Sequence, residues 1–281
     1  MSKVGEYILQ RLSRQVTAED FLNESCEKRL VDVRKHIDDL EQTFPDFRDG
    51  IEGRSVLDIG CWEGAESIAI ALCGAKEVVG IDIRLDMAKA NSLKRQFAPA
   101  HDIGFTTMDA ARTTFPDNRF EAVVTIGSFE HFRDPFRVLE EIRRITCPGG
   151  RIYVTSSVWA HPWGAHMNFF TKVPWVQFIF SERTIMNVRN RYRHDGAQRF
   201  SDVEGGLNKI GVRRFKQYAK ALRLDTEYLY LRPVNGLTLL SRLPFVNEFF
   251  TNYIVAILKK PQDSLTRSLS GTAKSQQHRR A

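Results

Sequence analysis

The chain has 281 residues, of which 42% are hydrophobic, and it carries a formal net charge of +7 at pH 7. This length allows one large α/β domain with an inserted segment, and the lack of a sequence repeat argues against a solenoid. The positive charge is local, because residues 181–216 and 259–281 each carry a net +5, which leaves the rest of the chain mildly acidic and without a broad basic surface for nucleic acid.

The cysteines and the apolar stretches exclude other classes of protein. Cys26, Cys61, Cys73 and Cys147 have neither C-x-x-C spacing nor a histidine-rich neighbourhood, so we predict free thiols and no metal site. The N-terminus interleaves charged and apolar residues, unlike a signal peptide, and the longest weakly charged stretch, 158–181, is interrupted by prolines, a glycine and a lysine. We therefore expect a cytoplasmic protein with at most a peripheral contact with a membrane.

Helical and strand patterns follow one another in a regular order along the chain. Apolar residues recur at steps of three and four up to about residue 49, which predicts an N-terminal helical segment over residues 1–50. Short apolar runs then alternate with amphipathic stretches, which is typical of a parallel sheet covered by helices on both faces. The expected strands are 55–59, 77–83, 103–108, 120–126, 151–156, 226–231 and 252–258, and the expected helices are 65–73, 86–97, 135–145 and 212–222.

The alternation stops after residue 157 and resumes at residue 212. We interpret residues 51–260 as one Rossmann-like α/β domain with a seven-stranded, mostly parallel sheet, and residues 158–211 as an inserted, acceptor-binding cap at the strand ends. The segment 261–281 is rich in Ser, Gln, Lys and Arg and has too few apolar residues to offset the entropy of ordering. We expect it to be a disordered basic tail.

The most informative motif is V-L-D-I-G-C-W-E-G at residues 56–64, in which a strand enters a tight glycine turn before a helix. The first such turn of an open parallel sheet is the usual place for a ligand. A dinucleotide site needs glycine at the middle of the turn so that the backbone can approach a pyrophosphate, but this position is Trp62. S-adenosylmethionine has no phosphate, and its sulfonium and amino groups make Asp58 a suitable partner, so the motif favours this cofactor.

Two further acids follow the next two strands. Asp82 ends the second strand, where a carboxylate can accept hydrogen bonds from both ribose hydroxyls. Asp109 follows the third strand and can accept from an adenine amino group, while Met108 or Ala110 packs against the ring. Each acid alone could be a helix cap, whereas three acids at successive strand ends favour a nucleoside site. Arg84 could instead signal the 2′-phosphate of NADP, but the tryptophan in the glycine turn disfavours that reading.

With these segments the chain resembles the class I S-adenosylmethionine-dependent methyltransferases, in particular the type 11 methyltransferase domain family, which includes methyltransferases of quinones and of sugars. The matching segments are VLDIGCWEG, VVGIDI, TMDA and SFEHFRDPFRVLEEIRRITCPGGRIYVT, and the match spans residues 55–157. The usual turn of the family is G-C-G-x-G, so Trp62 is a departure that can reshape the pocket over the methionine moiety.

The resemblance implies cofactor contacts at the strand-end residues named above and adds Gly127 and Ser128, after the fourth strand. The full set of predicted cofactor-binding residues is Asp58, Gly60, Cys61, Trp62, Gly64, Asp82, Ile83, Met108, Asp109, Ala110, Gly127 and Ser128. We expect Cys61 to be a small packing residue there, since methyl transfer needs no enzyme nucleophile.

Methyl transfer to an oxygen is a direct displacement on the sulfonium methyl group, so catalysis requires alignment and removal of the acceptor proton. Histidine is the natural base because its unperturbed pKa of about 6.5 lies near neutral pH. The candidate catalytic residues are His131, after the fourth strand, and His161 and His166, after the fifth. His131 could equally be a partner of Asp134 or a cofactor contact, and the other two could be surface loop residues.

The inserted segment is aromatic and then basic. Seven Trp and Phe residues lie within residues 158–181, and an arginine-rich run follows. Aromatic rings stack on sugars, prenyl chains or phenols, and arginines bind phosphate or carboxylate. We therefore predict O-methylation of a sugar, of a lipid-linked or anionic glycan, or of a related small molecule. The alternative is C- or O-methylation of a quinone-like or phenolic acceptor, and a lipid acceptor at a membrane surface would suit the same features. The aromatic residues could also be only the core of the cap, and the arginines a solvated face.

Two other classes of function fit parts of the sequence. A nucleic-acid methyltransferase would use the basic segments, but the chain has no N-P-P-Y-like motif for exocyclic amines. A non-catalytic cofactor-binding protein would keep the strand-end acids and need no acceptor pocket.

Overall fold

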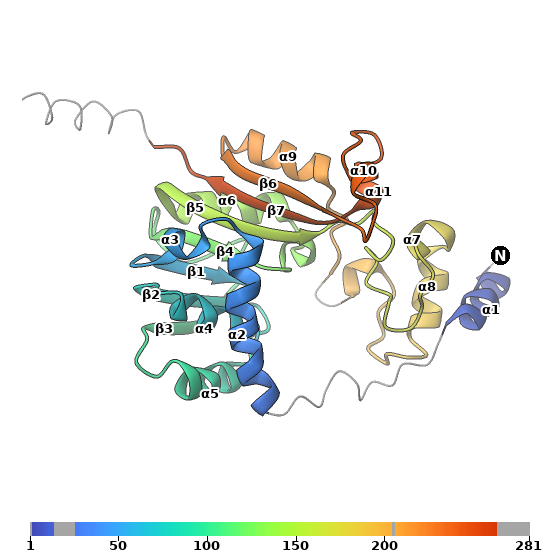
Figure 1. Cartoon of the computed structure of the whole chain (residues 1–281). Helices are drawn as coiled ribbons and strands as arrows, with labels where there is room; N and C mark the ends of the chain where they lie inside the picture. Colours follow the sequence, from blue (N-terminus) through green and yellow to red (C-terminus); the bar gives the residue numbers. More distant parts are fainter. Residues whose placement is uncertain (1, 14–25, 204–205, 263–281) are drawn as a thin grey trace, which may run out of the picture.

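The computed structural model describes residues 2–13, 26–203 and 206–262 (Figure 1). Its centre is a seven-stranded sheet of strand order β3-β2-β1-β4-β5-β7-β6, in which β7 runs antiparallel to both of its neighbours and the other pairs are parallel. The strands are β1 (Ser55–Ile59), β2 (Glu77–Asp82), β3 (Ile103–Thr107), β4 (Phe120–Thr125), β5 (Thr146–Ser157), β6 (Asp225–Pro233) and β7 (Thr251–Lys259). The predicted seven-stranded, mostly parallel sheet is confirmed.

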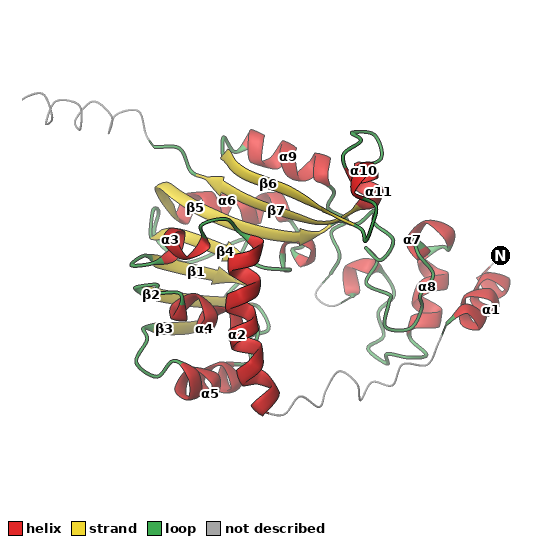
Figure 2. Cartoon of the chain, in the orientation of Figure 1, coloured by secondary structure: helices red, strands yellow, loops and turns green. Residues whose placement is uncertain are grey.

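Helices cover both faces of this sheet (Figure 2). One face carries α2 (Cys26–Thr43), α3 (Phe47–Ile51), α4 (Ala65–Leu72) and α5 (Met87–Phe97), and the other carries α6 (Pro135–Ile145) and α9 (Val212–Ala221). Each face buries its own apolar cluster; Ile254 belongs to one and Val255 to the other. Successive residues of a strand point to opposite faces, so a strand that is buried on both sides is a continuous apolar run.

Two of the helices that cover the sheet, α5 and α6, begin at aspartates that satisfy one of their first backbone N–H groups. Asp86 accepts a hydrogen bond from the backbone nitrogen of Lys89 (3.0 Å), and Asp134 accepts one from that of Arg137 (3.1 Å). The first residue of α6 is Pro135, which has no backbone N–H and so leaves none without a hydrogen-bond partner. The E-H-x-x-D-P segment, residues 130–135, therefore leads from the loop after β4 directly into the first residue of α6.

The segment between β5 and α9 forms a further layer beyond the strand ends. It contains α7 (Val176–Ile179), α8 (Glu182–Arg189) and the short 3-10 helix η3 (Phe200–Asp202), and it buries a third apolar cluster that includes Phe170 and Ile185. Helix α1 (Ser2–Leu12) adds Leu9 to this cluster and lies beside α8 (Figure 1). We call this layer, residues 158–211 together with α1, the cap.

The predicted N-terminal helical segment is thus divided between two places. Helix α1 packs in the cap, whereas α2 packs on α4 against the sheet. Residues 14–25, with Phe21 and Leu22 of the predicted helical pattern, lie outside the described residues, as does most of the predicted basic tail, 263–281. Between β6 and β7 the structure adds two short helices that the sequence did not indicate, α10 (Thr238–Ser241) and α11 (Asn247–Phe250).

Several basic side chains of the arginine-rich run stabilise the cap itself. Arg189 is fully buried and forms two hydrogen bonds with the carboxylate of Asp195, of 2.5 and 2.7 Å. Arg191 pairs with Glu6 of α1 (3.5 Å), and Lys209 lies 5.2 Å from the ring centre of Trp159. These contacts match the alternative in which the aromatic and basic residues are cap structure. Among the described residues, no helix has the length and apolar character to cross a membrane.

Candidate active site

The glycine turn after β1 lies at the carboxyl end of the sheet, where the strand order reverses between β1 and β4. Gly60 and Gly64 have φ values of 85° and 86°, in the left-handed region that favours glycine. A Cβ atom on Gly60 would lie 2.1 Å from the Oγ atom of Ser128. Only glycine therefore lets the loops after β1 and β4 approach each other. This contact brings two of the predicted cofactor-binding segments together.

Asp82 joins the loops after β1, β2 and β3. Its Oδ2 atom accepts a hydrogen bond from the backbone nitrogen of Trp62 (3.1 Å), and its Oδ1 atom accepts one from that of Arg84 (2.7 Å). Its carbonyl oxygen accepts from the nitrogen of Met108 (3.2 Å). A carboxylate can accept about four hydrogen bonds. Two acceptor positions are left for a ligand, which matches the two hydroxyls of a ribose.

The loops that this carboxylate joins expose large apolar side chains. Trp62 and Ile83 are 63% and 66% exposed, and Met87 is 40% exposed. Exposed apolar groups that gather at one place commonly mark a ligand site. Asp109, also exposed, accepts a hydrogen bond from the nitrogen of Ala111 (2.9 Å), and the neighbouring Met108 and Ala110 are half-buried. These loops can therefore surround an adenosine with apolar walls and acidic acceptors.

Asp58 and Cys61 lie beneath the turn rather than on its surface. The Asp58 carboxylate is buried and accepts a hydrogen bond from the Ser67 hydroxyl of α4 (2.6 Å). Burial, and next the nearby Glu66, raise the pKa of Asp58 to about 8. Burial also raises the pKa of the Cys61 thiol, as expected of a packing residue. A direct contact between Asp58 and the cofactor stays a prediction.

The loop after β4 leads from the glycine turn to the cap. Ser128 donates a hydrogen bond to the carbonyl of Gly60 (3.5 Å), and the nitrogen of Gly127 donates to the Thr155 hydroxyl (2.9 Å). The short 3-10 helix η2 (Phe129–His131) follows. The Nδ1 atom of His131 lies 2.7 Å from the carbonyl oxygen of Gly206. A carbonyl only accepts, so the proton of neutral His131 lies on Nδ1, and Nε2 presents a lone pair.

The suggested partner of His131, Asp134, instead caps α6. The cap residue that holds this loop is Asn208, which no sequence pattern indicated. Its amide nitrogen donates to the carbonyls of Phe129 (2.7 Å) and Phe132 (2.9 Å), and its backbone nitrogen donates to that of Glu130 (2.9 Å). These three hydrogen bonds from Asn208 fix the path of the backbone through η2.

Asn208→Ala is expected to lower the free energy of unfolding by about 1–3 kcal/mol, because two carbonyls lose their partner. It should also slow turnover more than it weakens cofactor binding, since the loop that it holds lies between the two sites. Urea unfolding and steady-state kinetics measure the two effects. Asn91→Ala is the matched control, because its amide donates to a carbonyl on the exposed surface of α5. Equal effects of the two substitutions would contradict this role of Asn208.

A cavity of about 450 Å³ opens between the ends of β5 and β7 and the cap. It is lined by Ser157, His161, Trp163, His166, Asn168, Phe169, Arg193, Asn252 and Tyr253. This lining combines aromatic walls with hydroxyl, amide and guanidinium groups. Asn252 and Tyr253 come from β7, far along the chain, and no sequence signal associated them with the site.

The three candidate histidines differ in their surroundings. His161 is buried; its Nδ1 atom accepts from the backbone nitrogen of Trp163 (3.2 Å), and its Nε2 atom lies 3.1 Å from the Ser157 hydroxyl. Burial, and next the neighbouring His166, lower the pKa of His161 to about 4. His166 is half-buried, and its ring centre lies 5.2 Å from that of His131. The structure therefore brings His131 and His166 together, while both nitrogens of His161 have partners within the protein.

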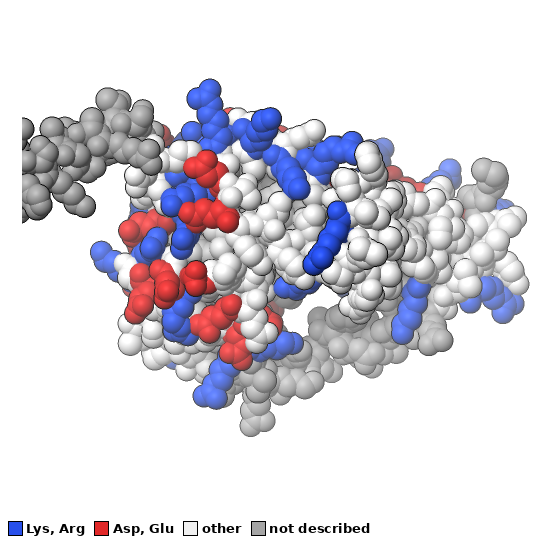
Figure 3. Space-filling model, turned by 45° about the horizontal axis from the view of Figure 1, so that its top comes forward, with Lys and Arg blue, Asp and Glu red and all other residues white. Residues whose placement is uncertain are grey.

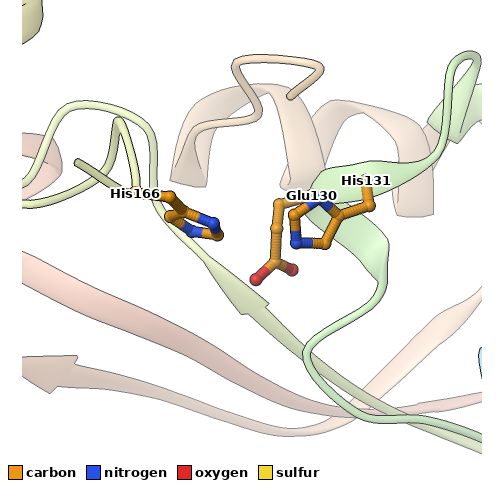
Figure 4. Close-up of side chains that lie close together, drawn as sticks. All are labelled: Glu130, His131 and His166. Atoms are coloured by element: carbon orange, nitrogen blue, oxygen red, sulfur yellow. The ribbon is translucent and has the colours of Figure 1, made fainter. Parts of the chain in front are cut away.

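Glu130 completes this group. Figure 4 shows that the side chains of Glu130, His131 and His166 point toward one another, two from the loop after β4 and one from the cap. Burial, and next the carboxylate of Glu130, raise the pKa of Tyr253 in the cavity wall. We predicted no metal site from the spacing of the cysteines and histidines along the sequence. That spacing does not show that two imidazoles and a carboxylate lie together in the fold.

The strand order, the antiparallel β7, the glycine turn and the strand-end acids define the Rossmann-like fold of S-adenosylmethionine-dependent methyltransferases. Residues 57–154 match a family model described as a methyltransferase domain. Residues 57–154 therefore form a methyltransferase domain, and the chain has the fold of solved S-adenosylmethionine-dependent methyltransferases.

Known proteins share parts of this chain. It is 34% identical to the chloroplastic tocopherol O-methyltransferase of Arabidopsis thaliana over 109 residues. This aligned stretch is 38% of this chain and 31% of that protein. It is 33% identical over 112 residues to the demethylmenaquinone methyltransferase of Renibacterium salmoninarum, with coverages of 40% and 44%. A solved S-adenosylmethionine-dependent methyltransferase from Methanosarcina mazei has the same fold, with a TM-score of 0.52, 19% identity, and coverage of 78% of this chain and 99% of that one. The chain thus spans less than half of the length of these two curated relatives.

Proposed function

We propose that the chain transfers the methyl group of S-adenosylmethionine to an oxygen atom of a small, hydroxylated ring bound in the cavity. One observation carries this proposal: the loop after β4 joins the cofactor side to the cavity. Ser128 contacts the glycine turn, and three residues later His131 lies beside His166, which lines the cavity. A donor on one side of this loop and an acceptor on the other would be aligned for direct displacement.

A quinol-like or phenolic acceptor has the strongest support. The two curated relatives described above are named for tocopherol and demethylmenaquinone. The volume of the cavity, about 450 Å³, lies in the range of small-molecule sites, and Trp163, Phe169 and Tyr253 offer aromatic surface for a ring. Deprotonation of a phenolic hydroxyl in the transition state would use a nearby base. His131, through its Nε2 lone pair, and His166 are the better placed candidates.

A sugar hydroxyl is the second candidate acceptor. Ser157, Asn168 and Asn252 give the cavity hydrogen-bonding groups that suit a polyol. The guanidinium of Arg193, 4.8 Å from the ring centre of Phe169, adds a positive charge in the same cavity, which suits an anionic glycan.

The surface near the cavity supports a peripheral contact with a membrane, where a prenylated ring would reside. Phe178 and Ile179 of α7 and Leu239 and Phe245 around α10 are 53–91% exposed, and Phe178 packs against Phe249 of α11. Helix α9, near α10, carries exposed basic residues. Figure 3 shows Lys and Arg gathered along the top of the view, whereas acids and bases mix at its left. Apolar residues beside a basic rim suit the surface of an anionic bilayer.

The test follows a labelled methyl group. The protein is incubated with methyl-labelled S-adenosylmethionine and either a prenylated hydroquinone in anionic lipid vesicles or an acidic oligosaccharide. We expect label in the hydroquinone, attached to oxygen. Label in the oligosaccharide alone would select the second candidate. Cofactor binding without transfer to either acceptor, or to an extract of the source cells, would contradict the proposed activity.

A further inference from the structure

We propose that Glu130, His131 and His166 form a binding site for a divalent transition-metal ion in the wall of the acceptor cavity. One potential ligand atom of each residue lies within 4.8 Å of the others. The three side chains converge from two separate parts of the chain (Figure 4). Two imidazoles and one carboxylate, with further positions open, are the ligand set of many zinc and iron(II) sites.

The environment of Glu130 points to a ligand. This side chain is 5% exposed, and its Oε2 atom has no hydrogen-bond partner within residues 2–13, 26–203 and 206–262. A buried carboxylate oxygen without a partner is costly, and protein interiors rarely keep one. A cation bound between the carboxylate and the histidines would compensate this cost.

His131 is already oriented as metal-binding histidines usually are. Its Nδ1–H group donates to the carbonyl of Gly206 (2.7 Å), which fixes the tautomer and directs the Nε2 lone pair away from that carbonyl. A hydrogen bond from the second ring nitrogen to a carbonyl is the common outer support of a metal-bound imidazole. The cap residue Gly206 therefore prepares a residue of the β4 loop for binding.

His166 supplies the third ligand from the cap. Its backbone φ of 55° lies in the left-handed region, which costs energy for a residue other than glycine and is frequent at functional sites. Metal–ligand distances of about 2.0–2.2 Å place tetrahedral ligand atoms roughly 3.4 Å apart, so the cluster must contract by at most about 1.5 Å, within reach of side-chain rotation. Since His166 also lines the cavity, the open positions of the ion would face the acceptor.

The role of the ion rests on the proposed function. His131 and His166 cannot accept the proton of the acceptor while their lone pairs bind an ion, so the ion would replace them in that role. It would bind the acceptor hydroxyl and lower its pKa, so that the proton leaves to water. The oxygen of the acceptor then forms a bond with the methyl carbon while the carbon–sulfur bond of the cofactor breaks. The electron pair of the broken bond stays on sulfur. The products are the methyl ether and S-adenosylhomocysteine.

The test measures metal binding itself. The full chain is stripped with a chelator and titrated with Zn²⁺ by calorimetry, with Mg²⁺ as a hard-cation comparison, and with Co²⁺ for visible absorption. We expect one tight Zn²⁺ equivalent, weak binding of Mg²⁺, and a Co²⁺ spectrum typical of four- or five-coordination. Glu130→Gln and His166→Ala should weaken Zn²⁺ binding by more than the roughly 10–100-fold effect of a lost outer-shell partner. Glu130→Gln keeps the shape of the side chain, so it separates binding from folding.

His36→Ala is the matched control, because His36 pairs with Glu66 on the far side of the sheet and should leave the equivalent intact. Unchanged affinity in both Glu130→Gln and His166→Ala, or no Zn²⁺ binding by the native chain, would overturn the proposal. The outcome is independent of methyl transfer. Tight metal binding without transfer contradicts the proposed function alone, whereas full transfer by chelator-treated protein contradicts the role of the ion.

Discussion

Asp82→Ala is expected to weaken the binding of S-adenosylmethionine by at least about 100-fold. A hydrogen bond to a charged group contributes about 1.5–3 kcal/mol, and two ribose hydroxyls would lose their acceptor. The substitution also removes the acceptor that holds the backbone of Trp62, so the glycine turn loses one of its supports. Titration calorimetry with the cofactor measures the change.

Two companions make this result specific. Asp82→Asn retains one oxygen acceptor and should give an intermediate affinity. Asp225→Ala removes an exposed carboxylate at the start of β6 and should bind the cofactor like the native chain. If Asp82→Ala bound with native affinity while folded, the assignment of the nucleoside site to the end of β2 would be wrong.

Gly60→Ala is expected to abolish measurable cofactor binding at micromolar concentrations. The new Cβ atom would lie 2.1 Å from Ser128 Oγ and 2.5 Å from its Cβ, and the residue would keep a φ of 85° that alanine disfavours. The loops after β1 and β4 must therefore separate, and both are predicted to contact the cofactor. Equilibrium dialysis with labelled cofactor gives the affinity.

Gly104→Ala is the matched control, because a Cβ atom there meets nothing within 4 Å and its φ lies outside the left-handed region. Thermal unfolding of both variants shows how much of the loss is loss of fold. Native affinity in a folded Gly60→Ala variant would mean that the cofactor does not depend on the close approach of these loops.

The sheet could be predicted from sequence because its strands are buried on both faces. Such strands are apolar runs of a few residues, and turn residues bound them. The start of β5 was missed: it begins at Thr146, five residues before the predicted position, because Pro148, Gly149 and Gly150 read as a turn. The short helices α10 and α11, with four residues each, have too few residues for a helical period to show.

The residues on the cofactor side of the site could be predicted from sequence for a related reason. Parallel strands end at one edge, so residues that follow them meet there whatever their distance in sequence. The hydrogen bonds of Asp82 join three such loops, as this rule predicts. The acceptor side has no such rule. His166, Asn208 and Tyr253 meet the β4 loop through the packing of the cap and β7, and this packing depends on side-chain shape rather than on periodicity.

His161 shows the same limit for a single residue. Its place in a loop after β5 suggested either a base or an exposed residue, but it is 4% exposed and has a partner on each nitrogen. Burial depends on what the cap places over the loop, which is decided by residues tens of positions away. Sequence spacing locates a histidine near a site; it does not set its proton affinity.

The contact between α1 and the cap links the first residues of the chain to a partner that is made much later. Asn187 of α8 donates to Glu6 of α1 (2.7 Å) across 181 residues of sequence, and Leu9 is fully buried only because the cap covers it. Closing so long a loop is entropically costly and slow relative to local contacts. Because α1 precedes the cap segment in the sequence, its apolar face around Leu9 has no partner during synthesis until residues 158–211 have been made.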